Sequence, residues 1–245
     1  MLFRSVILHD VGISCRRIVN GLKELHIDMA QVEGIFISHE HSDHIAGLQQ
    51  LLKRFDIPVY TKQGTWREIQ DKLVVPKNQL IELTKGSLTL GNLIVEPFAV
   101  SHDAADPIGI NVFSGNDKAT VVTDTGIISD DILHRLDDST LLVLEANYDP
   151  HMLRFGPYQP FLKQRVASDE GHLSNEMAAQ ALLMMKRPDF MQVILAHRSE
   201  NNNNAVLVTQ TIGKMLVDGG VRIGPEMKLQ HGQPNEIVSM QSVKR

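Results

Sequence analysis

The chain has 245 residues, 42% of them hydrophobic, which is enough to bury a sizeable core and falls in the range where layered α/β folds form one domain. We therefore expect a single domain over residues 1–245. The formal net charge of −5 argues against a protein that coats nucleic acid with a globally basic surface, although it leaves room for a local basic patch.

The cysteine content and the N-terminus indicate the compartment. Cys15 is the only cysteine, which excludes an internal disulfide and suits a reducing cytosol. The apolar N-terminal run is broken by His9 and Asp10, and no small-residue cleavage site follows it, so it does not resemble a signal peptide. No apolar stretch approaches the roughly 18–20 residues that span a bilayer. We expect a cytoplasmic protein that is not embedded in a membrane.

Short β-rich runs alternate with amphipathic helical segments along the whole chain, and no linker or repeat separates two halves. The apolar, β-branched residues 34–38 predict a buried strand, and apolar residues at helical spacing predict a helix over 45–55, with the His-rich residues 39–44 as the turn between them. Further strands are predicted over 57–61, 88–90, 93–100, 108–113, 119–123, 141–144 and 193–196, and further helices over 65–73 and, after the N-cap Ser174, up to Lys186.

Five of the predicted strands are followed by His, Asp or Glu. Carboxyl ends of strands are where α/β sheets collect ligands, although the sequence leaves open which edge these residues share. The five residues are His39, His102, Asp124, Glu145 and His197.

The segment His39-Glu-His41-Ser-Asp43-His44 carries the strongest chemical signal. A chance H-x-H-x-D-H pattern in such a chain is on the order of one in a thousand. In extended backbone, His39 and His41 point to one face and can bind one metal ion, while the turn into the helix directs Asp43 and His44 toward a second. The alternative is a solvated loop in which Asp43 caps the helix, but three imidazoles would add nothing there that Ser or Asn could not provide. We therefore favour a metal site.

Six segments in order resemble the metallo-β-lactamase superfamily, and within it the YycJ/WalJ-like bacterial proteins, related more distantly to tRNase Z and the PhnP phosphodiesterases. The resemblance runs from about Val6 to the C-terminus. The segments are ISHEHSDHIAGL (37–48), FAVSHDAADP (98–107), VTDTG (122–126), LEAN (144–147), GHLSN (171–175) and AHRSENN (196–202).

The resemblance implies an αββα sandwich that holds two divalent metal ions. Taken alone, His102 or His197 would more often be a surface or core histidine than a ligand. A ligand set of nitrogen and oxygen without thiolate suits Zn, Mn or Fe, and the sequence does not choose among them. The implied ligands are His39, His41 and His102 on one ion, Asp43, His44 and His197 on the other, and Asp124 bridging both.

Two departures from the family pattern have structural consequences. The first strand of the family and its Ser-Gly-Ser-Ser-Gly-Asn loop, ahead of residues 8–15, are missing, which we expect to uncover a sheet edge and remove backbone amides near the site. Arg198 stands where we expect an apolar residue, and the sequence does not indicate its role.

Two metal ions can clamp an oxygen-rich substrate and lower the pKa of a bridging water, and the bridging hydroxide then attacks the ester. We expect Asp43 to orient or deprotonate that water. His172 resembles the additional histidine of the phosphodiesterase branch and, oriented by Glu145, would protonate the leaving oxygen. Alternatively, His172 contacts a phosphate or is structural, and Glu145 supports a metal-bound histidine.

The sequence therefore favours a metal-dependent phosphodiesterase or nuclease, and the resemblance implies a 5'-to-3' exonuclease acting on DNA. Lys163 and Arg165 are candidate contacts to the phosphate backbone, although most basic residues of this region are solvated surface. The alternatives are a hydrolase of small esters, lactones or thioesters and a regulatory protein with a residual metal site. The sequence is compatible with a homodimer.

Overall fold

The computed structural model describes residues 5–84, 86–234 and 236–241, so the start of the N-terminal apolar run and both ends of the expected domain lie outside the described residues. The contacts divide the chain into two compact units: Met1–Pro97 with Ala104–Ile108, and Phe98–Asp103 with Gly109–Arg245. Neither unit is a contiguous stretch of sequence. The single domain over 1–245 stays a prediction.

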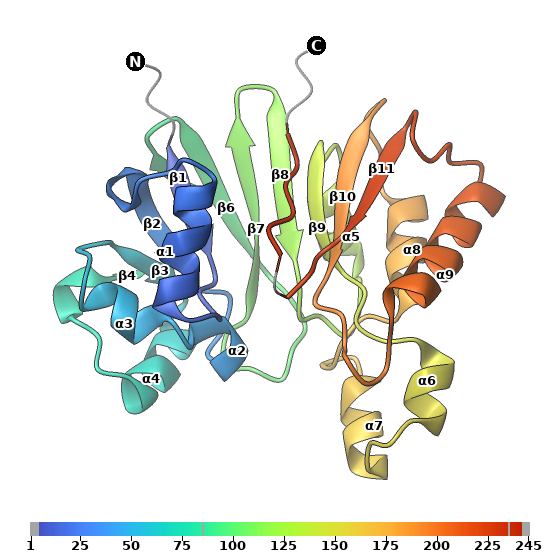
Figure 1. Ribbon diagram of the computed structural model, residues 1–245, viewed down its shortest axis with the longest axis horizontal. Helices are drawn as coiled ribbons and strands as arrows, with labels where there is room; N and C mark the ends of the chain where they lie inside the picture. The colour runs from blue at the N-terminus through green and yellow to red at the C-terminus, as the bar shows by residue number, and fades with distance from the viewer. Residues whose placement is uncertain (1–4, 85, 235, 242–245) are drawn as a thin grey trace. The chain divides into compact units, whose positions relative to one another are not determined.

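The first unit contains a parallel sheet in the strand order β1-β2-β3-β4 and the antiparallel hairpin β5–β6 (Figure 1). Since all four strands of the sheet are parallel, their carboxyl ends share one edge. In the described part of the chain, the outer side of β1 has no strand partner. The strands are β1 (Val6–His9), β2 (Val32–Phe36), β3 (Val59–Thr61), β4 (Leu80–Glu82), β5 (Leu88–Leu90) and β6 (Leu93–Ala99).

The core of the first unit lies between this sheet and its helices, with Ile35, Leu48 and Ile69 fully buried. Two of these side chains belong to helices, and Ile35 belongs to β2. The helices are α1 (Cys15–Glu24), α2 (Ser42–Ile45), α3 (Leu48–Leu52) and α4 (Gln63–Lys72), with 3-10 turns η1 (Met29–Gln31) and η2 (Lys77–Gln79).

The single helix predicted over 45–55 is wrong, because the chain forms the two short helices α2 and α3 instead. The break lies at Gly47, whose N–H donates to the carbonyl of Val11 at 2.8 Å. A Cβ at this position would lie 2.3 Å from the carbonyl oxygen of Ile13. The helical spacing of the apolar residues did not reveal this contact, because it comes from a distant segment of the chain.

The second unit contains a sheet in the order β11-β10-β9-β8-β7 (Figure 1). Strand β7 is antiparallel to β8, whereas β8, β9, β10 and β11 run parallel to one another. The carboxyl ends of these four parallel strands therefore share one edge. The strands are β7 (Ile108–Ser114), β8 (Asp117–Val122), β9 (Leu141–Glu145), β10 (Met191–Ala196) and β11 (Met227–His231).

Helices of the second unit cover its sheet, and the core between them includes Leu142, Leu144, Leu182 and Ile212, all fully buried. Two further helices, α6 and α7, follow β9 and form a separate lobe with a small apolar cluster of their own (Figure 1). The helices are α5 (Asp130–Leu136), α6 (Pro150–Phe155), α7 (Pro160–Val166), α8 (Asn175–Met184) and α9 (Ala205–Asp218).

The predicted N-cap of α8 is confirmed, because the hydroxyl of Ser174 accepts a hydrogen bond from the N–H of Met177 at 3.1 Å. The helix ends at Met184 rather than at Lys186. Lys186 leaves the helix because its N–H donates to the Asp137 carboxylate at 2.7 Å, and its ammonium group pairs with Asp138. No helix within the described residues is long and apolar enough to cross a bilayer.

We predict that Gly12→Ala destabilises the first unit. The added Cβ would lie 1.5 Å from the carbonyl oxygen of Asp43, and backbone atoms cannot move aside as the end of a flexible side chain can. We expect a loss of about 1–3 kcal/mol in the free energy of unfolding, measured by urea denaturation.

The matched control is Gly213→Ala in α9, where the nearest atom to the new Cβ is 3.8 Å away. Alanine in a helix interior is favoured over glycine by about 0.5–1 kcal/mol, so this variant should be as stable as the wild type or more stable. If the Gly12 variant is as stable as the wild type, the segment of residues 10–12 is not packed tightly against the loop that carries Asp43.

Candidate metal centre

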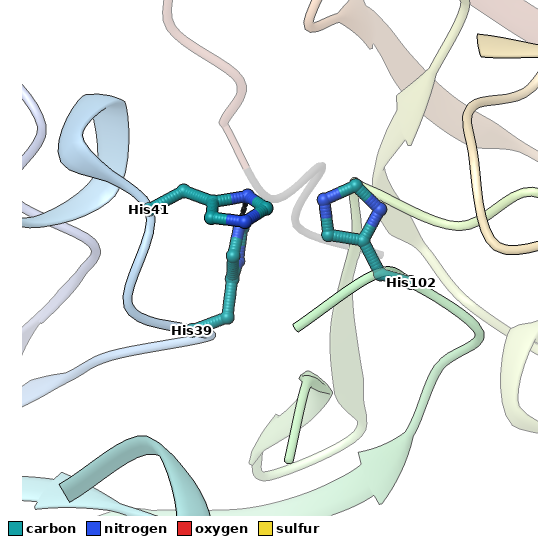
Figure 2. A group of neighbouring side chains, drawn as sticks. All are labelled: His39, His41 and His102. Atoms are coloured by element: carbon teal, nitrogen blue, oxygen red, sulfur yellow. Dashed lines mark hydrogen bonds between the residues drawn. The ribbon is translucent and has the colours of Figure 1, made fainter. Parts of the chain in front are cut away.

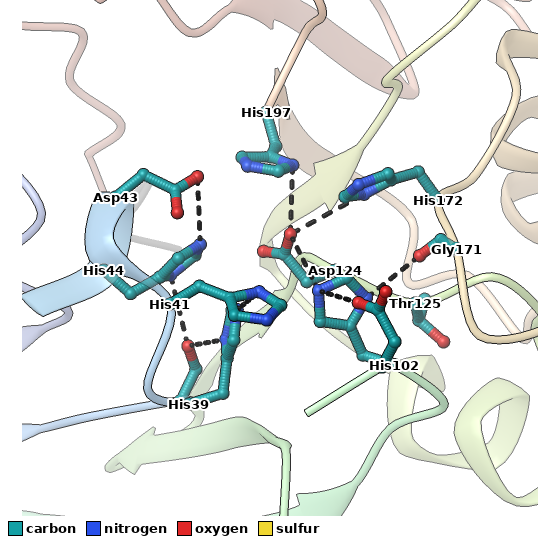
Figure 3. A network of polar contacts seen from close by, with 12 residues as sticks. His39, His41, Asp43, His44, His102, Asp124, Thr125, Gly171, His172 and His197 are labelled. Carbon is teal, nitrogen blue, oxygen red and sulfur yellow. Dashed lines mark hydrogen bonds and ion pairs between the residues drawn. The ribbon is translucent and has the colours of Figure 1, made fainter. Parts of the chain in front are cut away.

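In the first unit, the half-buried carboxylate of Asp10 organises the His-rich loop. Asp10 follows β1, and its Oδ2 lies 2.8 Å from Nδ1 of His44 and accepts the Ser38 hydroxyl proton at 2.8 Å. Its Oδ1 accepts the N–H of Ser38 at 2.7 Å. With His44 Nδ1 donating to this carboxylate, Nε2 is the nitrogen that can coordinate a metal ion. Asp43 lies on that side of the ring, with its Oδ2 3.8 Å from Nε2 (Figure 3).

His39 is held indirectly by the same carboxylate. Its Nδ1 lies 2.9 Å from the Ser38 hydroxyl, which gives its own proton to Asp10, so the imidazole is the donor in this pair. His39 Nε2 then faces Nδ1 of His41 at 3.0 Å (Figure 2). Two nitrogens bound tetrahedrally to one zinc ion lie about 3.3 Å apart, given bonds of about 2.0–2.1 Å. The spacing of the two rings therefore fits a shared ion.

The ionisation of Asp10 follows from these contacts. Burial is the largest effect and favours the protonated acid. The charges of His9 and His44 and the hydrogen bonds from His44 and Ser38 act in the opposite direction. Together they outweigh burial, so the pKa of Asp10 lies well below its usual range. Asp10 is therefore an anion that holds the imidazoles of the loop in place.

In the second unit, the carboxylate of Glu145, at the carboxyl end of β9, orients histidines as Asp10 does in the first unit. Its Oε1 lies 2.9 Å from Nδ1 of His172 and 2.8 Å from Nδ1 of His197. Its Oε2 accepts the N–H groups of Thr125 at 3.2 Å and Leu173 at 3.0 Å. Burial, the largest effect, favours the protonated acid, but the hydrogen bonds from the two histidines lower the pKa of Glu145 well below its usual range.

Asp124, at the carboxyl end of β8, lies among the histidines of the second unit (Figure 3). Its Oδ1 is 3.3 Å from Nδ1 of His197, 3.6 Å from Nδ1 of His172 and 3.8 Å from Nε2 of His102. Ligand atoms of Asp124, Glu145, His172 and His197 all lie within 4.8 Å of one another. This separation allows neighbouring ligand atoms to share one ion.

His102 is also held through Nδ1, which lies 3.1 Å from the carbonyl oxygen of Gly171. The carbonyl can only accept, so Nδ1 carries the proton and Nε2 is available for coordination. Burial lowers the pKa of His102, and the nearby Asp124 carboxylate only partly offsets this effect. Both features favour a neutral imidazole, the form that binds metals.

Three site residues have left-handed backbone conformations, with φ of 57° at Asp10, 55° at Asp124 and 51° at His197. Each residue follows the last residue of a parallel strand by one or two positions. Such a conformation is uncommon outside glycine, and it turns the side chain away from the direction that the strand would give it. The backbone at these strand ends is shaped for the site rather than for regular structure.

The structure groups every predicted site residue with others of the set inside its own unit. His39, His41, Asp43 and His44 share the loop of the first unit, and Asp124, Glu145, His102, His172 and His197 lie together in the second. The predicted contact between Glu145 and His172 is present. The assignment of the ligands to two ions stays a prediction.

Sequence reasoning missed Asp10 and Ser38. Asp10 is a polar residue directly after a short apolar run, the same signal that identified Asp124, but it lies outside the His-rich motif. Of the two candidate phosphate contacts, Arg165 is paired with Asp103, which raises the pKa of the guanidinium, and the Lys163 ammonium donates to the carbonyl of Arg154 at 2.8 Å.

Comparison with known proteins identifies the family of the chain. Residues 7–197 match the Beta-lactamase superfamily domain. The chain is 34% identical over 239 residues to exodeoxyribonuclease YycJ of Bacillus anthracis, covering 97% of this chain and 90% of the relative. It is 31% identical over 237 residues to exodeoxyribonuclease WalJ of Streptococcus pneumoniae, covering 95% and 88%. The predicted resemblance is confirmed.

Solved structures show the same fold. The metallo-β-lactamase fold protein YhfI from Bacillus subtilis has a TM-score of 0.67 at 15% identity, covering 92% of this chain and 84% of that protein. Zn²⁺-bound PqqB from Methylobacterium extorquens also has a TM-score of 0.67 at 15% identity, covering 94% and 82%. A diphosphatase of the PhnP family has a TM-score of 0.61 at 17% identity, covering 93% and 77%. The predicted metallo-β-lactamase fold, with its two sheets, is confirmed.

We predict that Asp10→Asn weakens metal binding, although Asp10 is not itself a predicted ligand. The amide cannot accept from His44 and Ser38 with the strength of a carboxylate, so the imidazoles lose their fixed orientation. Loss of such a supporting group typically costs 10–100-fold in metal affinity, measured by competition with a chelator.

The matched control is Asp71→Asn, which removes an exposed carboxylate of the same unit. It should bind metal as the wild type does. Unchanged affinity of the Asp10 variant would contradict a positioning role for this carboxylate.

Proposed function

Since the chain belongs to the β-lactamase superfamily and to the family of the YycJ and WalJ exodeoxyribonucleases, we propose that it is a metal-dependent phosphodiesterase that degrades DNA from the 5' end. The observation that carries the proposal is the pairing of His172 and His197 on one buried carboxylate, Glu145. This pairing sets a candidate proton donor beside a predicted metal ligand. Both functions accelerate the hydrolysis of an unactivated phosphodiester.

We further propose that the chain binds two divalent ions, with His39, His41 and His102 on one, Asp43, His44 and His197 on the other, and Asp124 on both. The donors fit the group, because His39, His44, His102 and His197 each have Nδ1 held by a fixed partner, which leaves coordination to Nε2. Bound ions supply positive charge that polarises a phosphodiester and acidifies a water molecule. The all-nitrogen and oxygen set suits Zn, Mn or Fe.

The residues around the ions supply the proton transfers. Glu145 is held anionic and accepts from Nδ1 of His172, which leaves Nε2 of His172 as the nitrogen that would give a proton to the leaving oxygen. Asp43 is 65% exposed at its side chain, so we assign it to the solvent-facing side of the site, where it orients the attacking water. Glu145 thus acts through His172 and His197 rather than on the substrate.

The DNA strand is the proposed partner. A local basic patch through Lys163 and Arg165 stays part of the proposal, although both side chains also have contacts within the chain. We propose a cytoplasmic location, which the single, buried Cys15 supports. The homodimer stays a prediction.

Metal analysis tests the first part of the proposal. Protein purified without chelator should contain two divalent ions per chain, and Asp124→Ala should retain fewer than one, because it removes the ligand shared by both. Elemental analysis gives the counts, and thermal melting with and without added metal gives an independent readout. A metal-free wild type that does not gain stability from Zn²⁺ or Mn²⁺ would refute the site.

Two variants separate metal binding from proton donation. Asp43→Ala should lose activity on every substrate and retain less metal. His172→Ala should retain both ions and lose about 10²–10⁴ in rate on 5'-labelled DNA, whose leaving oxygen requires a proton. A nitrophenyl phosphodiester, whose leaving group departs without a proton, should lose much less rate in the His172 variant.

The comparison uses both substrates and both variants, with metal content measured on the same samples. Equal losses of the His172 variant on DNA and on the activated diester would assign His172 to phosphate contact. Full DNA cleavage by the Asp43 variant would overturn the mechanism, and hydrolysis of small esters without any DNA cleavage would replace the proposed substrate.

A further inference from the structure

A large hollow in the second unit opens beside the proposed proton donor. Its volume is about 950 Å³, near the upper end of the range for ligand sites, and both His172 and His197 line it. The walls continue past these histidines to Arg198, Ser199 and Gly232. A substrate held at His172 would therefore extend along this hollow.

Arg198 is the unusual residue of these walls. It directly follows His197 after the end of β10, and its Nη1 is buried without a hydrogen-bond partner. Across residues 5–84, 86–234 and 236–241, no carboxylate forms an ion pair with it. Arg165 in the same hollow differs, because it is paired with Asp103. A buried N–H group without a partner is destabilising, so its retention calls for a ligand.

Within the described residues, no ion pair neutralises the positive charge of Arg198. Burial lowers the pKa of His231 at the end of β11, and the positive charge of Arg198 lowers it further. The described residues that line the hollow include two guanidinium groups, Arg165 and Arg198, and one carboxylate, Glu200. Because Arg165 is paired with Asp103, the guanidinium of Arg198 is the one that is available to an anionic ligand.

We propose that Arg198 binds a backbone phosphate next to the phosphodiester that is hydrolysed, so that the enzyme recognises a strand rather than an isolated diester. The proposal rests on the proposed function, whose reaction centre includes His172 and His197. A guanidinium suits this role because its planar set of donors matches two phosphate oxygens at once. Arg198 therefore determines specificity for a substrate with consecutive phosphates.

The test compares Arg198→Leu and Arg198→Lys with the control Arg222→Leu. Arg222 pairs with Glu226 on an exposed surface of the same unit and is not part of the hollow's walls. Binding of a fluorescent single-stranded phosphorothioate oligonucleotide is measured by anisotropy over a salt series. We expect about tenfold weaker binding for Arg198→Leu. The slope of log affinity against log salt should fall by about 0.7, the value for one phosphate contact on a single strand.

Arg198→Lys should keep most of the salt slope, because it keeps the charge, while binding more weakly than the wild type because it loses the paired geometry. Arg222→Leu should match the wild type in affinity and slope. Thermal melting confirms that all variants are folded. If Arg198→Leu binds the oligonucleotide with wild-type affinity and slope, the inference is wrong.

Activity separates this inference from the proposed function. On an oligonucleotide, Arg198→Leu should raise KM about tenfold with a smaller change in kcat, and its loss on bis-nitrophenyl phosphate, which has one phosphate, should be several-fold smaller. Equal losses on both substrates would refute the assignment to a flanking phosphate. A wild type that hydrolyses neither substrate would refute the proposed function, whereas weaker strand binding by Arg198→Leu would still support Arg198 as a contact to a backbone phosphate.

Discussion

In each unit, one carboxylate that accepts hydrogen bonds from histidine determines how the candidate site residues are oriented. Burying an ionised carboxylate is unfavourable unless several donors surround it. Asp10 and Glu145 meet this condition because histidines and nearby N–H or hydroxyl groups donate to them, and the carboxylates in turn fix the orientation of the histidines. Carboxylate and imidazole thus depend on each other, and removing either leaves an unfavourable buried group.

Parallel strands bring these groups together. In the first unit, Asp10 and the His-rich loop follow neighbouring parallel strands, β1 and β2. In the second unit, Asp124, Glu145 and His197 follow β8, β9 and β10, again neighbours in one parallel set. The left-handed backbone at three of these strand ends then turns the side chains toward one another. The same arrangement, with polar residues at the carboxyl ends of neighbouring parallel strands, therefore occurs in both units.

The sequence predicted the parts of the fold that have a local cause. The two strands predicted on either side of residues 91 and 92, which pair in the structure, and the cap at Ser174 depend on turn and cap residues that act within a few positions. The break in the helix at Gly47 was not, because it depends on Val11 and Ile13 from another segment.

The same distinction applies to the site. The closely spaced histidines are visible as a motif, and the resemblance to a known family supplied distant residues such as Glu145 and His172. Asp10 was not predicted as a site residue because it lies 28 residues from Ser38 and 34 residues from His44 in the sequence. The role of Arg198 could not be read from the chain, since it depends on which groups fail to reach it in the folded state.

The interleaving of the two units affects how the chain can fold as it leaves the ribosome. The N–H of Ala105 donates to the Glu40 carboxylate at 2.9 Å, and the N–H of Ile108 donates to the carbonyl of Ser38 at 3.1 Å. The backbone donors that fasten the His-rich loop are thus synthesised some 65 residues after the loop itself. A nascent chain that ends at Pro97 contains every predicted ligand of the first unit yet lacks these donors. A nascent chain that ends at the border between the units therefore cannot yet form all the hydrogen bonds of the first unit.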